Sequence, residues 1–387
     1  MSNVNGSWTA HFDGNMMWSN AALVTKGMAP YGAVALGEID QICERLRVRQ
    51  DEPEAWNEEW VAMGERLEKV AIEAENNGHR MTAGNYFLRA GMYYFTGERF
   101  LYPGPEKKEL GRKAIECQQA GILRRHPNVE RVEVPYENTT LPALFMKAQG
   151  VSGPAPTIVV FDGMDNCKEM SILFAGLEFA ARGWHTLCVD GPGQGETLRL
   201  QDLYARHDYE IAGAAAFDYL GTRAEVNAAR VGVMGYSFGG YYAARIAAME
   251  PRYKIGVAMS ALHWDLAGWQ QKIFDRQSGN ATSTPQSAFH FRWIMGHLDD
   301  AQAAIEKAKK FSMVDLAPKM TTPFMIVHGD NDKVVPVASA HKLYEAIGSS
   351  NKALKILTSE DGGHYHAQAD NRQVGTDVLA DWIAENI

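Results

Sequence analysis

The sequence predicts an α/β fold in which helices cover both faces of a mainly parallel sheet, with a helical domain ahead of it. From residue 128 onward, short apolar runs typical of buried strands alternate with helical segments, a pattern typical of parallel sheets. Between residues 54 and 120, apolar residues instead recur at helical spacing. The chain has 387 residues, too many for one compact core of ordinary size, so we expect two parts.

The N-terminal domain, residues 1–127, is predicted to contain three helices. Apolar residues fall at spacings of three and four from Trp56 to Ala74, and Asn77-Gly78 then makes a stop signal. A second helix extends to the prolines at 103 and 105, and a third covers about 106–120. Their aromatic residues fit a helix-helix core. A homodimer contact through these helices is left open.

The second domain, residues 128–387, carries the predicted strands. The apolar or alternating runs are 129–136, 141–148, 157–163, 184–190, 230–235, 254–260, 323–329 and 353–359. Helices are predicted at about 208–221 and from residue 238. The alternation breaks between about 261 and 312, where helical and aromatic sequence without an obvious strand predicts a cap.

Composition excludes several classes of protein. Hydrophobic residues make up 46% and charged residues 22% of the chain, as in globular proteins. The net charge is −9 and there is no stripe rich in Lys and Arg, which argues against a nucleic-acid partner. We expect a cytoplasmic protein with no membrane association, because the sequence shows neither a signal-peptide pattern nor about 18 consecutive apolar residues.

A reactive serine is predicted at residue 237. Gly235-Tyr236-Ser237-Phe238-Gly239 directly follows a predicted strand and directly precedes a predicted helix. This is the context of a nucleophile elbow, in which glycines flank the serine so that neighbouring backbone segments can approach. Serine is a poor nucleophile at neutral pH, so a histidine base and a carboxylate that orients it are required.

Two aspartates compete for the role of the acid. Asp330 and Asp332 both follow the strand that ends near residue 329, in the chain order expected for this arrangement. We favour Asp332, which lies three residues after Gly329 and immediately before the stretch that leads to Val335-Pro336. The alternative role for Asp330 is that of a turn residue that bonds its own backbone.

Two histidines compete for the role of the base. His364 and His366 lie in a glycine-rich loop after the last predicted strand, and we favour His364, next to Gly362-Gly363. A metal-binding role for the pair is disfavoured, because no third ligand stands at a recognised metal spacing. We therefore expect no metal.

The oxyanion of an acyl-transfer intermediate needs backbone donors. We predict the N–H of Phe238 and that of Met164, which follows Gly163 after an earlier strand. The stretch "VDGPGQGET" at 189–197 lacks the glycine spacing of a dinucleotide site, and its proline removes a possible donor. We interpret it as a loop at the rim of the pocket and expect no cofactor.

Together the elbow, "DGPGQGE", "HGDNDKVVP" and "GGH" resemble the α/β-hydrolase superfamily over about residues 128–387. The helical segments "WNEEWVAMGERLE" and "NYFLRAGMYYFTGERF" are similar to a narrower group, the bacterial 2,6-dihydroxypseudooxynicotine hydrolases and the fungal yellowish-green polyketide-shortening hydrolases. This resemblance implies the α/β-hydrolase fold, and a triad of Ser237, Asp332 and His364 that cleaves a carbon–carbon bond beside an aryl or polyketide ketone. It also implies that the helical domain, residues 1–127, contributes to the roof of the active site. Related members are esterases or peptidase-like.

The expected partner is a small carbonyl substrate, aromatic or polyketide-like. Candidate contacts in the cap are His263, Trp264, Asp265, Trp269, Phe289, Phe291 and Trp293. The alternative is that these aromatic residues only pack the cap. We therefore expect a carbon–carbon hydrolase and leave two alternatives open, a carboxylesterase and a non-catalytic scaffold that acts as a binding protein.

Overall fold

The computed structural model describes residues 8–278 and 286–387. The chain divides into two compact units. The described part of the first unit is 8–127 with 286–290, and that of the second is 128–278 with 291–387. The boundary after residue 127 lies where the strand-rich sequence begins. No helix of the described chain is both long enough and apolar enough to cross a membrane.

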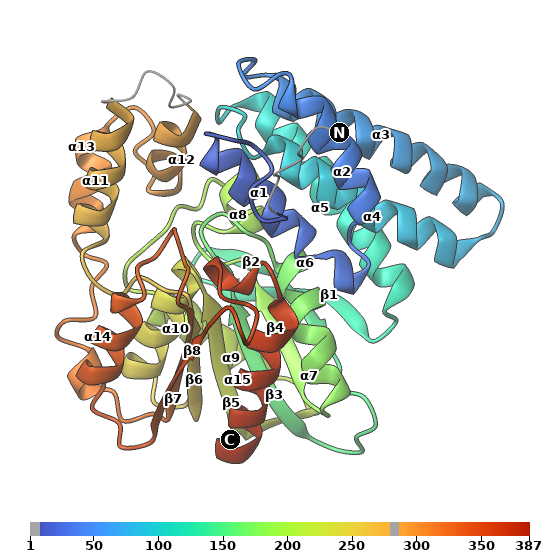
Figure 1. Cartoon of the computed structure of the whole chain (residues 1–387). Helices are drawn as coiled ribbons and strands as arrows, with labels where there is room; N and C mark the ends of the chain where they lie inside the picture. The colour runs from blue at the N-terminus through green and yellow to red at the C-terminus, as the bar shows by residue number, and fades with distance from the viewer. Residues whose placement is uncertain (1–7, 279–285) are drawn as a thin grey trace. The chain divides into compact units, whose positions relative to one another are not determined.

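The first unit is helical (Figure 1). Its helices are α1 (Met16–Lys26), α2 (Leu36–Arg47), α3 (Ala55–Asn76), α4 (Arg80–Glu98) and α5 (Pro105–Arg125). The last three are those that the apolar spacing predicts, and α1 and α2 come in addition. Trp56 lies at the centre of the core, with its ring centroid 5.3 Å from those of both Trp18 and Trp60. Gly91 allows α4 and α5 to approach closely, because a Cβ there would lie 2.5 Å from the backbone nitrogen of Gln118.

The second unit is built on an eight-stranded sheet of order β1-β2-β4-β3-β5-β6-β7-β8. The strands are β1 (Val129–Tyr136), β2 (Thr139–Met146), β3 (Ala155–Phe161), β4 (His185–Val189), β5 (Val226–Tyr236), β6 (Ile255–Met259), β7 (Phe324–Gly329) and β8 (Lys352–Leu357). β1 pairs antiparallel with β2 and β2 antiparallel with β4, and the remaining pairs are parallel. The carboxyl ends of β3, β5 and β7 therefore lie along one edge of the sheet.

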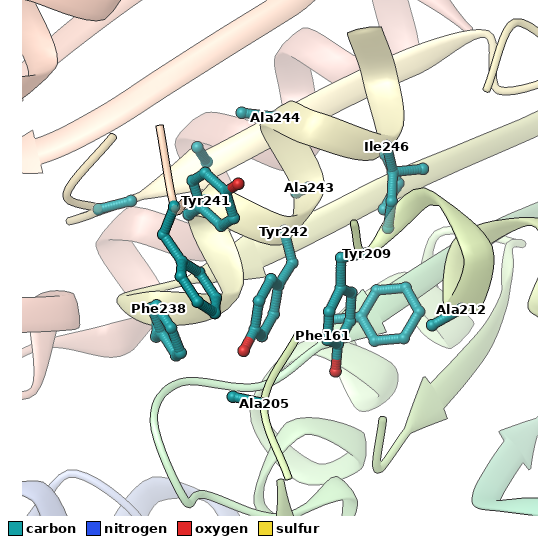
Figure 2. Close-up of a cluster of buried hydrophobic side chains, with 14 of the residues drawn as sticks. Phe161, Ala205, Tyr209, Ala212, Phe238, Tyr241, Tyr242, Ala243, Ala244 and Ile246 are labelled. Carbon is teal, nitrogen blue, oxygen red and sulfur yellow. The ribbon is translucent and has the colours of Figure 1, made fainter. Parts of the chain in front are cut away.

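Helices cover both faces of this sheet (Figure 1), which confirms the predicted fold class. One side carries α9 (Glu210–Gly221), α10 (Phe238–Met249) and α14 (Ala338–Ala346), and the other carries α6 (Lys168–Ser171), α7 (Leu177–Ala181) and α15 (Arg372–Asn386). Tyr209 and Tyr242 stack with centroids 3.4 Å apart in the cluster beneath α10 (Figure 2). This packing fixes the helix that follows the serine.

The segment expected to form a cap is helical where it is described. It holds α11 (Leu266–Ser278), α12 (Gln286–Ile294) and α13 (Ala301–Ala308), and residues 261–278 and 286–312 contain no strand. The short helix α8 (Gly195–Leu200) follows the loop after β4.

Candidate functional site

Ser237 lies on a sharp turn between β5 and α10. Its φ of 54° and ψ of −124° place a non-glycine residue in a sparsely populated region, as at a nucleophile elbow. A Cβ on Gly235 would meet the backbone of Gly239. A Cβ on Gly239 would in turn meet the carbonyls of Phe161 and Asp162. The flanking glycines are therefore required by the close approach of backbone segments.

A hydrogen-bonded chain runs from this serine to a buried carboxylate through His366. The distance from His366 Nε2 to Ser237 Oγ is 2.8 Å, and that from His366 Nδ1 to Asp332 Oδ2 is 2.7 Å. With Nδ1–H donating to the carboxylate, Nε2 is left as the acceptor for the serine proton. This is the connectivity of a nucleophile, base and acid.

Asp332 is held in its ionised form by its surroundings. Its side chain is fully buried, and Oδ1 accepts hydrogen bonds of 2.8 Å from the backbone N–H groups of both Val334 and Val335. Burial raises the pKa of the carboxyl, but the neighbouring His366 imidazole and the N–H of Val335 outweigh it, so the pKa lies below its ordinary value. Asp332 is thus suited to orient and stabilise a histidine cation.

The choice of His364 as the base is corrected by the structure. His364 Nδ1 lies 3.2 Å from Asp330 Oδ1, and the histidine that contacts Ser237 is His366. The backbone N–H of Asn331 donates to the carbonyl of His364 at 3.1 Å and so joins the two loops. Two His–Asp pairs therefore lie side by side, His364 with Asp330 and His366 with Asp332. The more buried pair, Asp332 with His366, contacts the serine. The glycines before His364 do not indicate which of the two histidines lies closer to the serine.

Gln368 is a residue of the site that was not among the predicted site residues. Ala367 and Gln368 both have positive φ, 50° and 52°, directly after His366. The Gln368 side chain is fully buried, and its Nε2 donates to Ser260 Oγ at 3.2 Å. This contact ties the histidine loop to the end of β6, and no sequence signal beyond a polar residue near the histidines pointed to it.

The predicted oxyanion donors lie on the two segments that flank Ser237. Phe238 is the first residue of α10, where a helix leaves its N–H without an intrahelical acceptor. A Cβ built on Gly163 would lie 3.3 Å from Ser237 Cβ, so the loop that carries Met164 is adjacent to the serine. The assignment of Phe238 and Met164 as donors stays a prediction.

Several of the cap residues predicted to contact substrate make structural contacts within the protein. The Asp265 carboxylate accepts from the N–H of Gly268 at 3.0 Å and so caps α11, and Trp269 Nε1 donates to the carbonyl of Val334 at 3.0 Å. Trp264 is buried, with Lys342 Nζ 4.9 Å from its ring centroid. The aromatic side chains at the end of the cap are also buried, namely Phe289, Phe291 and Trp293. These contacts favour the packing interpretation.

His263 is the exception among these cap residues. It is 1% exposed, and neither ring nitrogen has a hydrogen-bond partner among the described residues. Burial lowers its pKa from 6.5 to about 3, so the ring is neutral near pH 7. Within the described ranges, no group of three or more His, Cys, Asp or Glu side chains could hold a metal ion.

Two family profiles match the chain. The family described as "Esterase FrsA-like" matches residues 50–273, more than half of the chain, and the family described as "Prolyl oligopeptidase family" matches residues 207–387. The first match joins the helical unit to the elbow, and the second contains the elbow together with the acid and histidine loops.

Several fungal and bacterial proteins are similar in sequence. Hydrolase LUC6 of Fusarium sp is 28% identical over 93% of this chain and 94% of its own length. Alpha/beta hydrolase xenA of Xenoacremonium sinensis is 30% identical over 71% of this chain and 64% of its own length. The 2,6-dihydropseudooxynicotine hydrolase of Paenarthrobacter nicotinovorans is 25% identical over 80% of this chain and 79% of its own length.

Solved structures share the fold. The 2,6-dihydroxy-pseudo-oxynicotine hydrolase superposes with a TM-score of 0.74 at 22% identity, over 93% of this chain and 95% of its own. AbyA5 superposes with a TM-score of 0.68 at 18% identity, over 91% of both chains. The sheet order, the elbow and these matches agree, and the chain therefore belongs to the FrsA-like esterase family of the α/β-hydrolase superfamily.

Proposed function

We propose that the protein is a serine hydrolase that cleaves a carbon–carbon bond next to a ketone in an aromatic or polyketide-like substrate. The observation that carries the proposal is the continuous chain of hydrogen bonds from Ser237 through His366 to Asp332. It has the connectivity that activates a serine as a nucleophile. The likeness to the 2,6-dihydropseudooxynicotine hydrolase supports carbon–carbon cleavage in particular.

The proposed reaction has two halves, formation of an acyl-enzyme on Ser237 and its hydrolysis by water, and His366 acts as base and then as acid in each half. Ser237 Oγ attacks the ketone carbon while His366 Nε2 takes its proton, and the oxyanion is bound by the N–H groups of Phe238 and Met164. The adduct then expels a carbon leaving group that the substrate stabilises, and His366 returns the proton to that carbon. Water, deprotonated by His366, then attacks the acyl-enzyme, and His366 gives this proton to Ser237 Oγ as the carboxylic acid is released.

A carboxylesterase is the second candidate. It needs the same three side chains with an oxygen leaving group, so the geometry of the triad suits both reactions. The family described as esterase FrsA-like, which matches residues 50–273, favours this alternative.

The decisive experiment compares matched substrates. An aryl 1,3-diketone and the corresponding aryl ester are incubated with wild type and with Ser237→Ala under single-turnover conditions, and the products are identified. We expect the diketone to be cleaved at a rate comparable to the ester, with both activities lost in Ser237→Ala. Turnover of the ester alone would make the preferred reaction wrong and establish an esterase.

A non-catalytic scaffold is tested separately with a fluorophosphonate probe, which reacts with activated serines. We expect wild type to be labelled at Ser237 and Ser237→Ala to remain unlabelled. Absence of labelling in the wild type would instead support a binding protein built on a hydrolase fold.

A further inference from the structure

The loop between β4 and α8, predicted to lie at the rim of the pocket, packs against the loop after β3. The N–H of Gly195 donates to the carbonyl of Asn166 at 2.7 Å. Gln194 Nε2 donates to the carbonyl of Asp162. Residues 190–196 thus bind the backbone at both ends of residues 162–166, the segment that carries Gly163 and Met164 beside Ser237.

Gln194 is well defined in this contact. It is fully buried, and its Oε1 accepts from the N–H of Gly191 at 3.2 Å and from the hydroxyl of Tyr209 at 2.8 Å. With Oε1 occupied by two donors, Nε2 is directed to the carbonyl of Asp162. Replacement of a buried amide that is hydrogen-bonded at both ends leaves its partners buried without a hydrogen bond, so the segments on both sides of it are expected to shift.

A buried ion cluster holds the far end of the same loop. Lys168 Nζ lies 2.9 Å from Asp190 Oδ2 and 2.8 Å from Glu196 Oε2, and the N–H of Lys168 donates to Asp190 Oδ1 at 2.7 Å. Asp190 also accepts from the N–H of Glu196 at 2.8 Å. A Cβ on Gly195 would collide with the Asp190 carboxylate, which explains the glycine in the "GQGE" stretch.

Tyr236, directly before the serine, contacts the loop from the opposite side. Its hydroxyl donates to Asp162 Oδ1 at 3.2 Å and lies 3.4 Å from Asn166 Nδ2. The ring is buried, and its edge would lie 3.3 Å from a Cβ on Gly163. The loop is therefore held between Gln194 on one side and the strand of the elbow on the other.

We propose that Gln194 and Tyr236 are positioning residues that fix residues 162–166 so that the backbone donors of this loop face the oxyanion formed at Ser237. The proposal rests on the proposed function. Neither side chain touches the reacting atoms, so their effect is exerted on transition-state stabilisation. Misplacement of a donor by about 1 Å can cost about a hundredfold in rate.

The test uses the full chain with three variants. Gln194→Met and Tyr236→Phe each remove contacts to the loop. Tyr253→Phe is the matched control, because it also removes a buried tyrosine hydroxyl, one that donates to the carbonyl of Gly213 on α9 at 2.8 Å rather than to residues 162–166 or 190–196. For each protein we measure the rate of Ser237 labelling by a fluorophosphonate, kcat and KM for the aryl ester, and the Ki of an aryl trifluoromethyl ketone, which forms a tetrahedral adduct.

We expect labelling and kcat to fall about tenfold to a hundredfold in Gln194→Met and Tyr236→Phe. KM should stay within about threefold of wild type while the Ki rises in parallel with the fall in kcat, because only the oxyanion is affected. Tyr253→Phe should stay within about threefold of wild type in every readout, since the hydrogen bond that it removes lies outside both loops.

Three results would overturn the proposal: wild-type rates in both loop variants, an equal loss in Tyr253→Phe, or a loss confined to KM. If Gln194→Met does not fold, Tyr236→Phe decides on the same criteria. A wild type that is not labelled at all refutes the proposed function and this inference with it, whereas a labelled wild type with insensitive variants refutes this inference alone.

Discussion

Two His–Asp pairs lie next to each other, and only one contacts the serine. The Asp332 side chain is fully buried and that of His366 is 11% exposed, whereas Asp330 is 46% exposed and His364 19%. A charge-assisted hydrogen bond is stronger where water is excluded. The inner pair therefore combines contact with Ser237 and the stronger electrostatic coupling.

Replacement of each histidine in turn by glutamine should distinguish their roles. His366→Gln should lower kcat/KM by at least about a thousandfold, because the serine loses its base. His364→Gln should lower it less than about tenfold, since this ring lies against Asp330. Steady-state kinetics on the aryl ester decides the point, and a larger loss in the His364 variant would restore it as the base.

Of the two aspartates, Asp332 should likewise matter more for kcat than Asp330. Asp332→Asn should reduce kcat by about a thousandfold to ten-thousandfold, because an amide can donate to Nδ1 and stabilise the wrong tautomer of His366. Asp330→Asn is the control, with the carboxylate replaced in the exposed pair, and should stay within about threefold of wild type. Similar losses in both variants, measured as kcat, would contradict the assignment.

At the scale of elements, the turn between β5 and α10 depends on backbone contact with the end of β3. Gly239 lies where a Cβ would collide with the carbonyls of Phe161 and Asp162. By contrast, Gly221, the last residue of α9, is exposed, and a Cβ added there would have nothing within 4 Å. The two positions offer a matched pair of glycines.

Gly239→Ala should lower the free energy of unfolding by about 2 to 3 kcal/mol, because backbone segments would have to move apart. It should also slow the labelling of Ser237. Gly221→Ala should change the stability by less than about 1 kcal/mol, toward greater stability, as expected for alanine in a helix. Urea unfolding measures both, and equal effects would show that the close approach at Gly239 is not needed.

At the scale of the whole molecule, the three residues of the site come from one unit. Ser237 and His366 are 129 residues apart in sequence, and both lie in the second unit, whose described part is 128–278 with 291–387. The stability of this unit also depends on buried groups away from the site. His263 is the clearest of them, because the folded protein keeps its ring neutral.

His263 should make the protein less stable as the pH falls. Its pKa is about 3 in the folded state against an ordinary 6.5, so between these values the unfolded chain binds a proton that the folded chain does not. From pH 7 to pH 5 this costs about 2 kcal/mol of unfolding free energy. Between these two pH values, the free energy of unfolding of His263→Phe should fall by about 2 kcal/mol less than that of wild type, as measured by urea unfolding.

The matched control is His341→Phe on α14, where the side chain is exposed. Because the buried ring of His263 is intact in this variant, the wild-type loss of about 2 kcal/mol between the two pH values should remain. If His263→Phe behaved like this control, the buried ring would not be the source of the effect.

Local sequence was sufficient for the fold class, the eight strands and the elbow. A buried strand needs an apolar run, and a tight turn beneath a serine needs glycines on both sides. Both requirements are met by residues adjacent in the chain. The helices α1 and α2 and the role of the "DGPGQGE" loop were not predictable in this way, because they depend on contacts with residues distant in sequence.

The order of residues along the chain therefore specifies a hydrolase fold with a serine at the turn between a strand and a helix, and with loops that carry aspartates and histidines. That His366 rather than His364 reaches Ser237 follows from the folded arrangement alone. The sequence around the two histidines does not distinguish them. Which of them contacts Ser237 depends on how deeply their loop is packed beside the loop that carries Asp332. That depth is set by backbone pairing between Asn331 and His364 and by the left-handed residues after His366, which no local pattern encodes.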